Sequence, residues 1–199
     1  MIPDDFRFIE IEHKFIVADG FDESRLRRVL AELEPTRTNR IRVRDRYYLT
    51  TQGAAQGFVL RHRFDEELQQ LTLKSLGADT EVRGEVNLDL GSRDSHQDQA
   101  AQVESFVERL GVVWRGTIHK DVEVWYYPDC EVVRYEATTE SRRITCVEFE
   151  ALQKDSVDDA LATLERFERA TGFLGTPRSH LSLPQLLFPE FAAATARQA

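Results

Sequence analysis

Apolar and polar side chains alternate with a period of two over much of this chain, and that pattern most constrains its fold. Successive side chains of a β-strand point to opposite faces, so the alternation is typical of strands with one buried face. We expect about eight strands, at roughly residues 6–17, 40–50, 57–64, 70–76, 81–90, 117–127, 130–138 and 142–152. Their number and short connections suit a closed antiparallel barrel.

Three segments show the apolar spacing of amphipathic helices, at residues 22–33, 95–110 and 156–171. A shorter apolar stretch at 181–191 contains Pro184 and Pro189, which limit its regularity. Helices can cover the outer apolar faces of the strands. We therefore predict an α+β fold with helices outside the barrel, forming one domain over residues 1–191 with a flexible tail at 192–199.

Composition excludes several classes of protein. A net charge of −9 over 199 residues argues against nucleic-acid binding, which usually needs a basic face. The sequence has no apolar run long enough for a membrane helix, and its first residues do not resemble a signal peptide. We therefore expect a cytoplasmic protein that binds neither nucleic acid nor membrane. Cys130 and Cys146 lack the spacing of a disulfide framework or a metal-binding pair.

Several predicted strands carry like charges on one face. Glu10, Glu12 and Lys14 share a face of the first strand, whose other face carries Ile11 and Phe15. Other strands add the acidic pair Glu148 and Glu150 and the basic residues Arg61, Arg63, Lys74 and Arg83. For any single strand, a solvated polar face is the simplest explanation. If helices cover the apolar faces from outside, however, the charges together must line the lumen.

A charged lumen indicates a specific chemistry. Carboxylates at close range repel one another and favour a bound cation. Mg²⁺ and Mn²⁺ prefer oxygen ligands and commonly share phosphate oxygens with a substrate. Arginine and lysine side chains can then hold the remaining phosphate charge. The pattern predicts a polyphosphate site that uses a divalent cation.

The motifs of this chain resemble those of the CYTH superfamily, the triphosphate tunnel metalloenzymes. Glu10, Glu12 and Lys14 match its E-x-E-x-K signature, a pattern that charged strands also produce by chance. The later motifs follow in the family order: Asp45-Arg46-Tyr47-Tyr48-Leu49-Thr50, Leu60-Arg61-His62-Arg63, Thr72-Leu73-Lys74, Arg83-Gly84-Glu85 and Glu148-Phe149-Glu150. The family includes class IV adenylyl cyclases, thiamine triphosphatases and inorganic triphosphatases. The ordered set is specific and extends from Ile9 to about Leu187.

The resemblance implies roles for individual residues. It implies an antiparallel tunnel with Mg²⁺ or Mn²⁺ bound by Glu10, Glu12, Glu148 and Glu150, and with Glu85 close to the metal. Phosphate contacts would come from Lys14, Arg61, Arg63, Lys74, Arg83 and Lys120. Lys14 and Glu12 are the implied catalytic residues, with Lys14 orienting or activating a water in hydrolytic members.

The chain also departs from the family pattern. Asn87 stands where a second acid is usual, and Val122 replaces the arginine of a K-x-R motif that begins at Lys120. Arg134 or Tyr135 takes the place of a tunnel aspartate, and Arg178-Ser179-His180 replaces a basic and aromatic pair. A hairpin turning at Pro128-Asp129 would bring Arg134 near Val122. We therefore expect Arg134 to enter the tunnel and restore a phosphate contact.

Three functions fit these residues. The first is metal-dependent hydrolysis of a triphosphate: inorganic triphosphate, thiamine triphosphate or ATP. The second is a class IV-like adenylyl cyclase that makes cyclic AMP from ATP. The third is a catalytically weakened polyphosphate- or nucleotide-binding module, favoured by the changes at Asn87, Val122 and Arg134. A homodimer is the default expectation for oligomeric state.

Two further patterns leave alternatives open. Arg40, Arg42, Arg44 and Arg46 form one basic strand face, which either extends the tunnel or pairs with nearby acids. Five aromatic residues lie in strands or at their ends, and core packing is favoured over stacking on a nucleobase: Tyr47, Tyr48, Trp125, Tyr126 and Tyr127.

Overall fold

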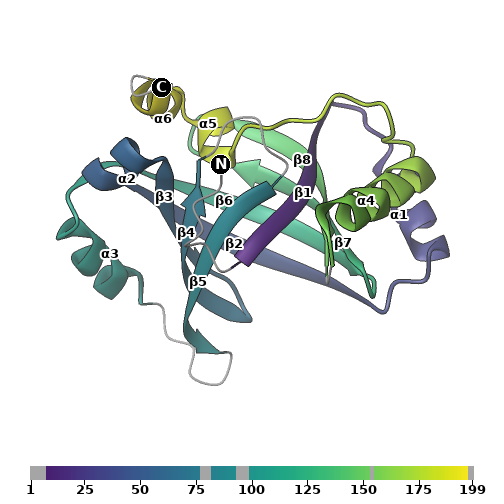
Figure 1. Ribbon diagram of the computed structural model, residues 1–199, viewed down its shortest axis with the longest axis horizontal. Coiled ribbons are helices and arrows are strands. Elements are labelled where there is room, and N and C mark those ends of the chain that lie inside the picture. Colours follow the sequence, from purple (N-terminus) through teal and green to yellow (C-terminus); the bar gives the residue numbers. More distant parts are fainter. Residues whose placement is uncertain (1–7, 77–81, 93–98, 153–154, 197–199) are drawn as a thin grey trace.

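The computed structural model describes residues 8–76, 82–92, 99–152 and 155–196, which form a closed antiparallel barrel with helices around it (Figure 1). The strands follow one another around the barrel in the order β1-β5-β4-β3-β2-β6-β7-β8. Their bounds are β1 Phe8–Val17, β2 Arg37–Thr50, β3 Phe58–Phe64, β4 Leu68–Ser75, β5 Val82–Ser92, β6 Val112–Tyr126, β7 Cys130–Thr138 and β8 Arg143–Ala151. The predicted α+β barrel is confirmed.

Two helices cover the outer face of β1, β7 and β8 (Figure 1). They are α1 (Glu23–Glu32) and α4 (Val157–Thr171), and each begins at a side-chain cap from Asp22 or Ser156. Phe15 and Phe149 point outward from β1 and β8 and pack with Leu164 of α4 and with Phe173 in one buried cluster. This cover occupies the apolar face of β1, so its charged face points into the barrel.

Two helical segments depart from the sequence prediction. Helix α2 (Thr51–Gln56) was not expected because it has no apolar stripe; Thr50 caps it and Gly57 ends it at a φ of 75°. The final helix, α6 (Pro189–Ala196), runs into the segment predicted to be a tail. Its alanine-rich sequence favours helix, and the helix continues past residue 191 as far as Ala196.

The barrel is closed near one end by the C-terminal helices. Helix α5 (Leu183–Leu187) and α6 lie beside that end in Figure 1. Leu183, Leu187 and Phe191 belong to a buried cluster with inward-facing side chains of β2, β6, β7 and β8, such as Ile118 and Tyr135. The remaining helix, α3 (Ala100–Glu108), packs outside on β2 and β3 through Val103 and Val107. Among the described residues, no helix is long and apolar enough to cross a bilayer.

The arginine alternation of β2 lies on the outer face of the barrel. Arg40 pairs with Glu123 at 2.8 Å, Arg42 with Asp121 at 3.3 Å and Arg46 with Glu104 at 3.4 Å. Of the two alternatives, pairing with nearby acids is therefore the observed one. The residues between these arginines point inward, and they include Ile41, Val43 and Asp45.

Candidate functional site

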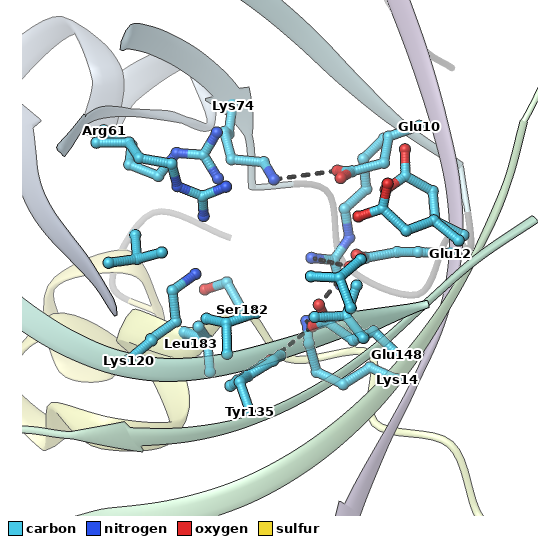
Figure 2. A pocket seen from close by; sticks show the side chains of 18 of the residues that line it. Glu10, Glu12, Lys14, Arg61, Lys74, Lys120, Tyr135, Glu148, Ser182 and Leu183 are labelled. Carbon is cyan, nitrogen blue, oxygen red and sulfur yellow. Dashed lines mark hydrogen bonds and ion pairs between the residues drawn. The ribbon is translucent and has the colours of Figure 1, made fainter. Parts of the chain in front are cut away.

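A cavity of about 310 Å³ lies inside the barrel and is bordered by charged side chains from most of its strands (Figure 2). The predicted site residues that border it are Glu10, Glu12, Lys14, Arg61, Arg63, Lys74, Arg83, Lys120, Glu148 and Glu150. Figure 2 shows Glu10, Glu12 and Glu148 on one side, with Arg61, Lys74 and Lys120 across the cavity. The barrel thus brings together residues that are far apart in sequence.

Lys14 is held between two carboxylates at the β1–β8 wall. Its Nζ lies 3.3 Å from Oε1 of Glu12 and 3.1 Å from Oε1 of Glu148. Burial would lower the pKa of Lys14, but Glu12 and Glu148 raise it above the usual lysine value. Lys14 is therefore a permanent cation at neutral pH, able to bind an anion or orient a water but not to accept a proton.

Glu10 and Glu12 also face cations of neighbouring strands. Nζ of Lys74 lies 3.0 Å from Glu10, and Nη1 of Arg83 lies 3.2 Å from Glu12. Burial raises the pKa of Glu12, but Lys14, Lys74 and Arg83 together bring it down to about 2. Burial and the neighbouring carboxylates instead raise the pKa of Glu10, despite the opposing effect of Lys74. The two acids therefore differ in the balance of charge around them.

A row of three carboxylates crosses the wall of the cavity, and we name Glu12, Glu150 and Glu131 the acidic row. Glu12 of β1 is the register partner of Glu150 in β8, which is in turn the partner of Glu131 in β7. Like charges directly opposite one another destabilise a sheet. Burial, followed by Glu10, Glu131 and Glu12, raises the pKa of Glu150 well above its usual range.

The acidic row was only partly anticipated from the sequence. Glu131 borders the cavity and was missed, although it shares the inward face of β7 with Val133 and Tyr135. Within the described part of the chain, neither Glu131 nor Glu150 lies within ion-pair distance of a basic side chain. Glu12 is paired with Lys14 and Arg83, so Glu131 and Glu150 are the members of the row that have no directly paired base among the described side chains.

The donor set of this wall fits a hard divalent cation. Carboxylate oxygens are the ligands that Mg²⁺ and Mn²⁺ prefer, and Glu10, Glu12, Glu148 and Glu150 all border this cavity. In the arrangement of the described residues, no group of three or more metal-binding side chains is assembled. The carboxylates of Glu10, Glu12 and Glu148 are turned toward Lys74, Arg83 and Lys14 instead.

Arg61 and Lys74 form the opposite wall with help from Glu85. Nη2 of Arg61 donates to Glu85 at 3.0 Å and to Thr72 at 3.1 Å, and Lys74 lies 3.5 Å from Glu85. Burial raises the pKa of Glu85, but Lys74, Arg61 and Arg63 lower it on balance. Glu85 therefore acts here as a charge partner of the basic wall.

A second buried carboxylate, Asp45, holds two further cations. Its oxygens accept from Nε and Nη2 of Arg63 at 2.8 and 3.0 Å, and Nζ of Lys120 lies 2.7 Å away. We name these residues the Asp45 triad. Although burial opposes it, the pair of cations holds the pKa of Asp45 well below its usual range. Burial and Arg63 lower the pKa of Lys120 to about 8, against the raising effect of Asp45.

The expectation that Arg134 enters the tunnel is wrong. Arg134 lies opposite Glu123 in the β6–β7 register, while Tyr135 lies opposite Val122. A shift of one residue reverses the face of a strand, so Arg134 points outward and pairs with Glu23 of α1. The arginine missing at Val122 is not restored from β7.

The other residues that depart from the family pattern also have defined positions in the structure. Tyr135 occupies the tunnel position, and its hydroxyl donates to Glu148 at 2.6 Å. Asn87 is exposed and accepts from Thr72 at 2.7 Å. The C-terminal segment is tied to the site, since the amide of Ser179 donates to the carbonyl of Lys14 at 2.8 Å and Arg83 donates to the carbonyl of His180 at 3.0 Å.

The five aromatic residues all take part in core packing. Tyr48, Trp125 and Tyr127 are buried in clusters outside the barrel wall, as expected for core residues. Tyr47 is buried in the cluster beneath α5, Tyr126 packs against that cluster, and both also border the cavity.

Comparisons with known proteins agree with this geometry. The CYTH domain model matches residues 9–175. A Pyrococcus horikoshii structure shares 15% identity at a TM-score of 0.71, covering 89% of this chain and 99% of that one. A candidate adenylate cyclase from Bacillus halodurans shares 18% identity at a TM-score of 0.57, covering 90% and 97%.

A plant protein is similar over a comparable length. It is a candidate adenylyl cyclase from Hippeastrum with a dominant triphosphatase activity, and it shares 15% identity at a TM-score of 0.54 over 96% of each chain. No curated protein matches the sequence. At these identities the solved structures show a common fold, and the family model covers most of the chain. This protein belongs to the CYTH domain family.

Proposed function

We propose that this protein hydrolyses a triphosphate with the help of a divalent cation held in the barrel cavity. One observation carries the proposal: carboxylates of β1, β7 and β8 face arginine and lysine side chains of β3 and β4 across a single cavity (Figure 2). Such a site can bind a polyphosphate and its cation together. The triphosphatase activity described for the Hippeastrum relative supports the same reaction class.

The ion pairs within the site couple the two binding events. Glu10, Glu12, Glu148 and Glu150 would hold the cation, and Lys14, Arg61, Lys74 and Arg83 would hold phosphate oxygens. Several of these acids and bases are paired with each other in the described arrangement. A metal–triphosphate complex would replace those pairs in one exchange, because it offers positive charge to the acids and negative charge to the bases.

The chain's own groups have distinct roles in this proposal. When bound, Mg²⁺ or Mn²⁺ would neutralise charge on the transferring phosphoryl group. Lys14, which stays protonated, orients the attacking water and stabilises developing negative charge. Glu12 is ionised at neutral pH because its pKa is about 2, so it is available as a carboxylate ligand. Arg63 and Lys120, organised by Asp45, contribute positive charge at one side of the cavity.

A substrate comparison tests the proposal. Purified protein is incubated with Mg²⁺ or Mn²⁺ and, separately, with inorganic triphosphate, thiamine triphosphate and ATP. We expect metal-dependent release of orthophosphate, abolished by Glu12→Gln. The matched control is Glu136→Gln on the outer face of β7, which should retain turnover.

Other outcomes separate the alternatives. Formation of cyclic AMP from ATP would favour the cyclase, whereas binding without turnover would favour a catalytically weakened module. A folded protein that binds none of the three compounds would contradict a triphosphate site in this cavity. Retained turnover in Glu12→Gln would remove Glu12 from the metal and catalytic set.

A further inference from the structure

We propose that Tyr135 is a positioning residue of the metal site, which holds the carboxylate of Glu148 in place for the cation. The inference rests on the proposed function, in which Glu148 is one of the cation ligands. Tyr135 departs from the family pattern, and the roles given above to the acidic and basic side chains leave it unused. Its hydroxyl nevertheless contacts the wall that would hold the cation (Figure 2).

Tyr135 lies between the Asp45 triad and the β1–β8 wall. Its side chain points inward from β7, is only 2% exposed and borders the cavity. On one side, Nζ of Lys120 lies 5.3 Å from the centre of the tyrosine ring. On the other side, the tyrosine hydroxyl donates to Oε1 of Glu148 at 2.6 Å. The tyrosine therefore connects a cation of the triad with an acid of the metal-binding wall.

The two contacts of Glu148 fall on the same carboxylate oxygen. Oε1 accepts from the hydroxyl of Tyr135 and also lies 3.1 Å from Nζ of Lys14. In the described part of the chain, no hydrogen bond or ion pair engages Oε2 of Glu148. Two donors on one oxygen restrict the rotation of the carboxylate and leave the other oxygen for a cation. Such donors strengthen metal binding, because the ligand side chain has less rotational freedom to lose.

The packing of the ring keeps the hydroxyl in one position. Tyr135 belongs to the buried cluster beneath α5, together with its register partners Val122 of β6 and Cys146 of β8. A donor whose side chain is already fixed by packing holds its partner without further ordering. A hydroxyl is also neutral, whereas an aspartate at this position would place a second negative charge beside Glu148. The departure at Tyr135 therefore supports Glu148 without adding to the repulsion among the acids.

Core filling alone makes a different prediction for Tyr135. Tyr135→Phe keeps the ring and its packing and removes only the hydroxyl. If the tyrosine served only to fill the barrel beneath α5, this variant would bind cations as tightly as the unmodified protein. If the hydroxyl positions Glu148, the affinity for the cation falls although the fold is retained. Cation affinity is therefore the measurement that distinguishes a positioning residue from core filling.

The test measures Mn²⁺ binding to the full chain by calorimetry, both alone and with imidotriphosphate, whose P–N–P bridges resist hydrolysis. We expect Tyr135→Phe to raise the Kd for Mn²⁺ by about tenfold. Orthophosphate release at limiting Mn²⁺ should fall by a similar factor. Saturating Mn²⁺ should restore it to within about threefold of the unmodified protein, because the lost hydroxyl acts through metal affinity.

Tyr127→Phe is the matched control. Tyr127 is also buried, and its hydroxyl donates to the carbonyl of Leu30 at 2.7 Å in the cluster outside the barrel wall. This variant likewise loses one buried hydrogen bond, so its stability should fall. Its Kd for Mn²⁺ should stay within about twofold of the unmodified value, because the lost bond does not touch the cavity. An equal loss of Mn²⁺ affinity in both variants would assign the effect to general loosening of the fold and overturn the inference.

The outcomes separate this inference from the proposed function. If Tyr135→Phe binds Mn²⁺ as tightly as the unmodified protein and metal-dependent orthophosphate release is seen, the inference is overturned and triphosphate hydrolysis stands. If Tyr135→Phe loses about tenfold in Mn²⁺ affinity but the unmodified protein hydrolyses no triphosphate, hydrolysis fails and the inference stands. If the unmodified protein binds no Mn²⁺, either alone or with imidotriphosphate, both fail together.

Discussion

The Asp45 triad and the acidic row both contribute side chains to the barrel cavity and differ in how their carboxylate charge is balanced. In the Asp45 triad, one carboxylate with no exposed surface is paired with Arg63 and Lys120, and its pKa lies well below the usual range. In the acidic row, Glu150 faces Glu12 and Glu131, and its pKa lies well above the usual range.

The comparison shows that burial alone does not decide the state of a carboxylate. Burial raises the pKa in both groups, and the neighbouring charges decide the outcome. The Asp45 triad carries a net positive charge and is assembled without a ligand, which suits a phosphate-binding surface. In the acidic row Glu12 is paired with Lys14 and Arg83, whereas Glu150 and Glu131 have no directly paired base among the described side chains, which suits a cation from solution.

The largest effect should follow from removing charge from the acidic row. We expect Glu150→Gln to lower metal-dependent kcat/KM by at least about 100-fold, because a carboxylate ligand is lost. The same variant should raise the free energy of unfolding of the metal-free protein by about 0.5 to 1 kcal/mol, because a carboxyl whose charge is disfavoured by burial and by its acidic neighbours is replaced by a neutral amide. Steady-state kinetics and urea unfolding measure the two effects.

Lower activity together with higher stability in Glu150→Gln would show that this carboxyl serves metal binding at a cost to the stability of the fold. If Glu150→Gln instead lost stability with its activity, the acidic row would be balanced by contacts within the protein. Mn²⁺ should raise the melting temperature of the unmodified chain more than that of the variant.

Removing the carboxylate of the Asp45 triad should destabilise the fold, in contrast to Glu150→Gln. Asp45→Asn leaves two buried cations without their shared partner, so we expect the free energy of unfolding to fall by about 3 kcal/mol or more. Urea unfolding at neutral pH measures this loss. The effect should shrink in acid, because a carboxylate with a lowered pKa stabilises the fold above its unfolded-state pKa and loses that contribution as pH falls through the folded-state value. An Asp45→Asn protein as stable as the parent would show that the triad does not organise this wall.

A smaller effect concerns the pH dependence of catalysis. Lys120 has a pKa of about 8 in the free protein, so its positive charge is present below that pH and lost above it. A bound phosphate favours the charged form, and kcat/KM should therefore fall by up to about tenfold per unit as pH rises above 8. Because the pKa of Lys120 is depressed in the fold, its own contribution to stability rises between pH 8 and the unfolded-state value.

Loss of activity through deprotonation of Lys120 can thus be distinguished from loss of activity through unfolding. Circular dichroism should show an intact fold where kcat/KM declines. Lys120→Arg keeps its charge at alkaline pH and should flatten the profile, while an unchanged break near pH 8 in that variant would assign the titration to another group.

The sequence was sufficient to predict the barrel and most of the cavity-lining charges. In a strand the face of a side chain depends only on whether its position is odd or even, so the alternation placed Glu10, Glu12 and Lys14 together. The pairing of Asp45 with Arg63 and Lys120 could not be predicted in this way, because it depends on the register among β2, β3 and β6.

Register also explains the remaining misses. Glu131 is recognised as part of the acidic row only when its partner Glu150 is known. The hairpin between β6 and β7 pairs Tyr126 with Glu131, and that register places Tyr135, not Arg134, beside Val122. The turn at Pro128-Asp129 is the predicted one, and a two-residue turn there pairs Val122 with Tyr135, so the outward position of Arg134 follows from the sequence once residues are counted across the turn.

Arg134 provides the smallest effect and the most direct check of that register. Its guanidinium pairs with Glu23 of α1 on the outside of the barrel, in partly exposed surroundings. We expect Arg134→Ala to leave kcat/KM within about twofold and to lower the free energy of unfolding by no more than about 1 kcal/mol, the usual range for such a pair. A loss of triphosphate affinity comparable to that of Lys120→Ala would place Arg134 in the cavity and overturn the register.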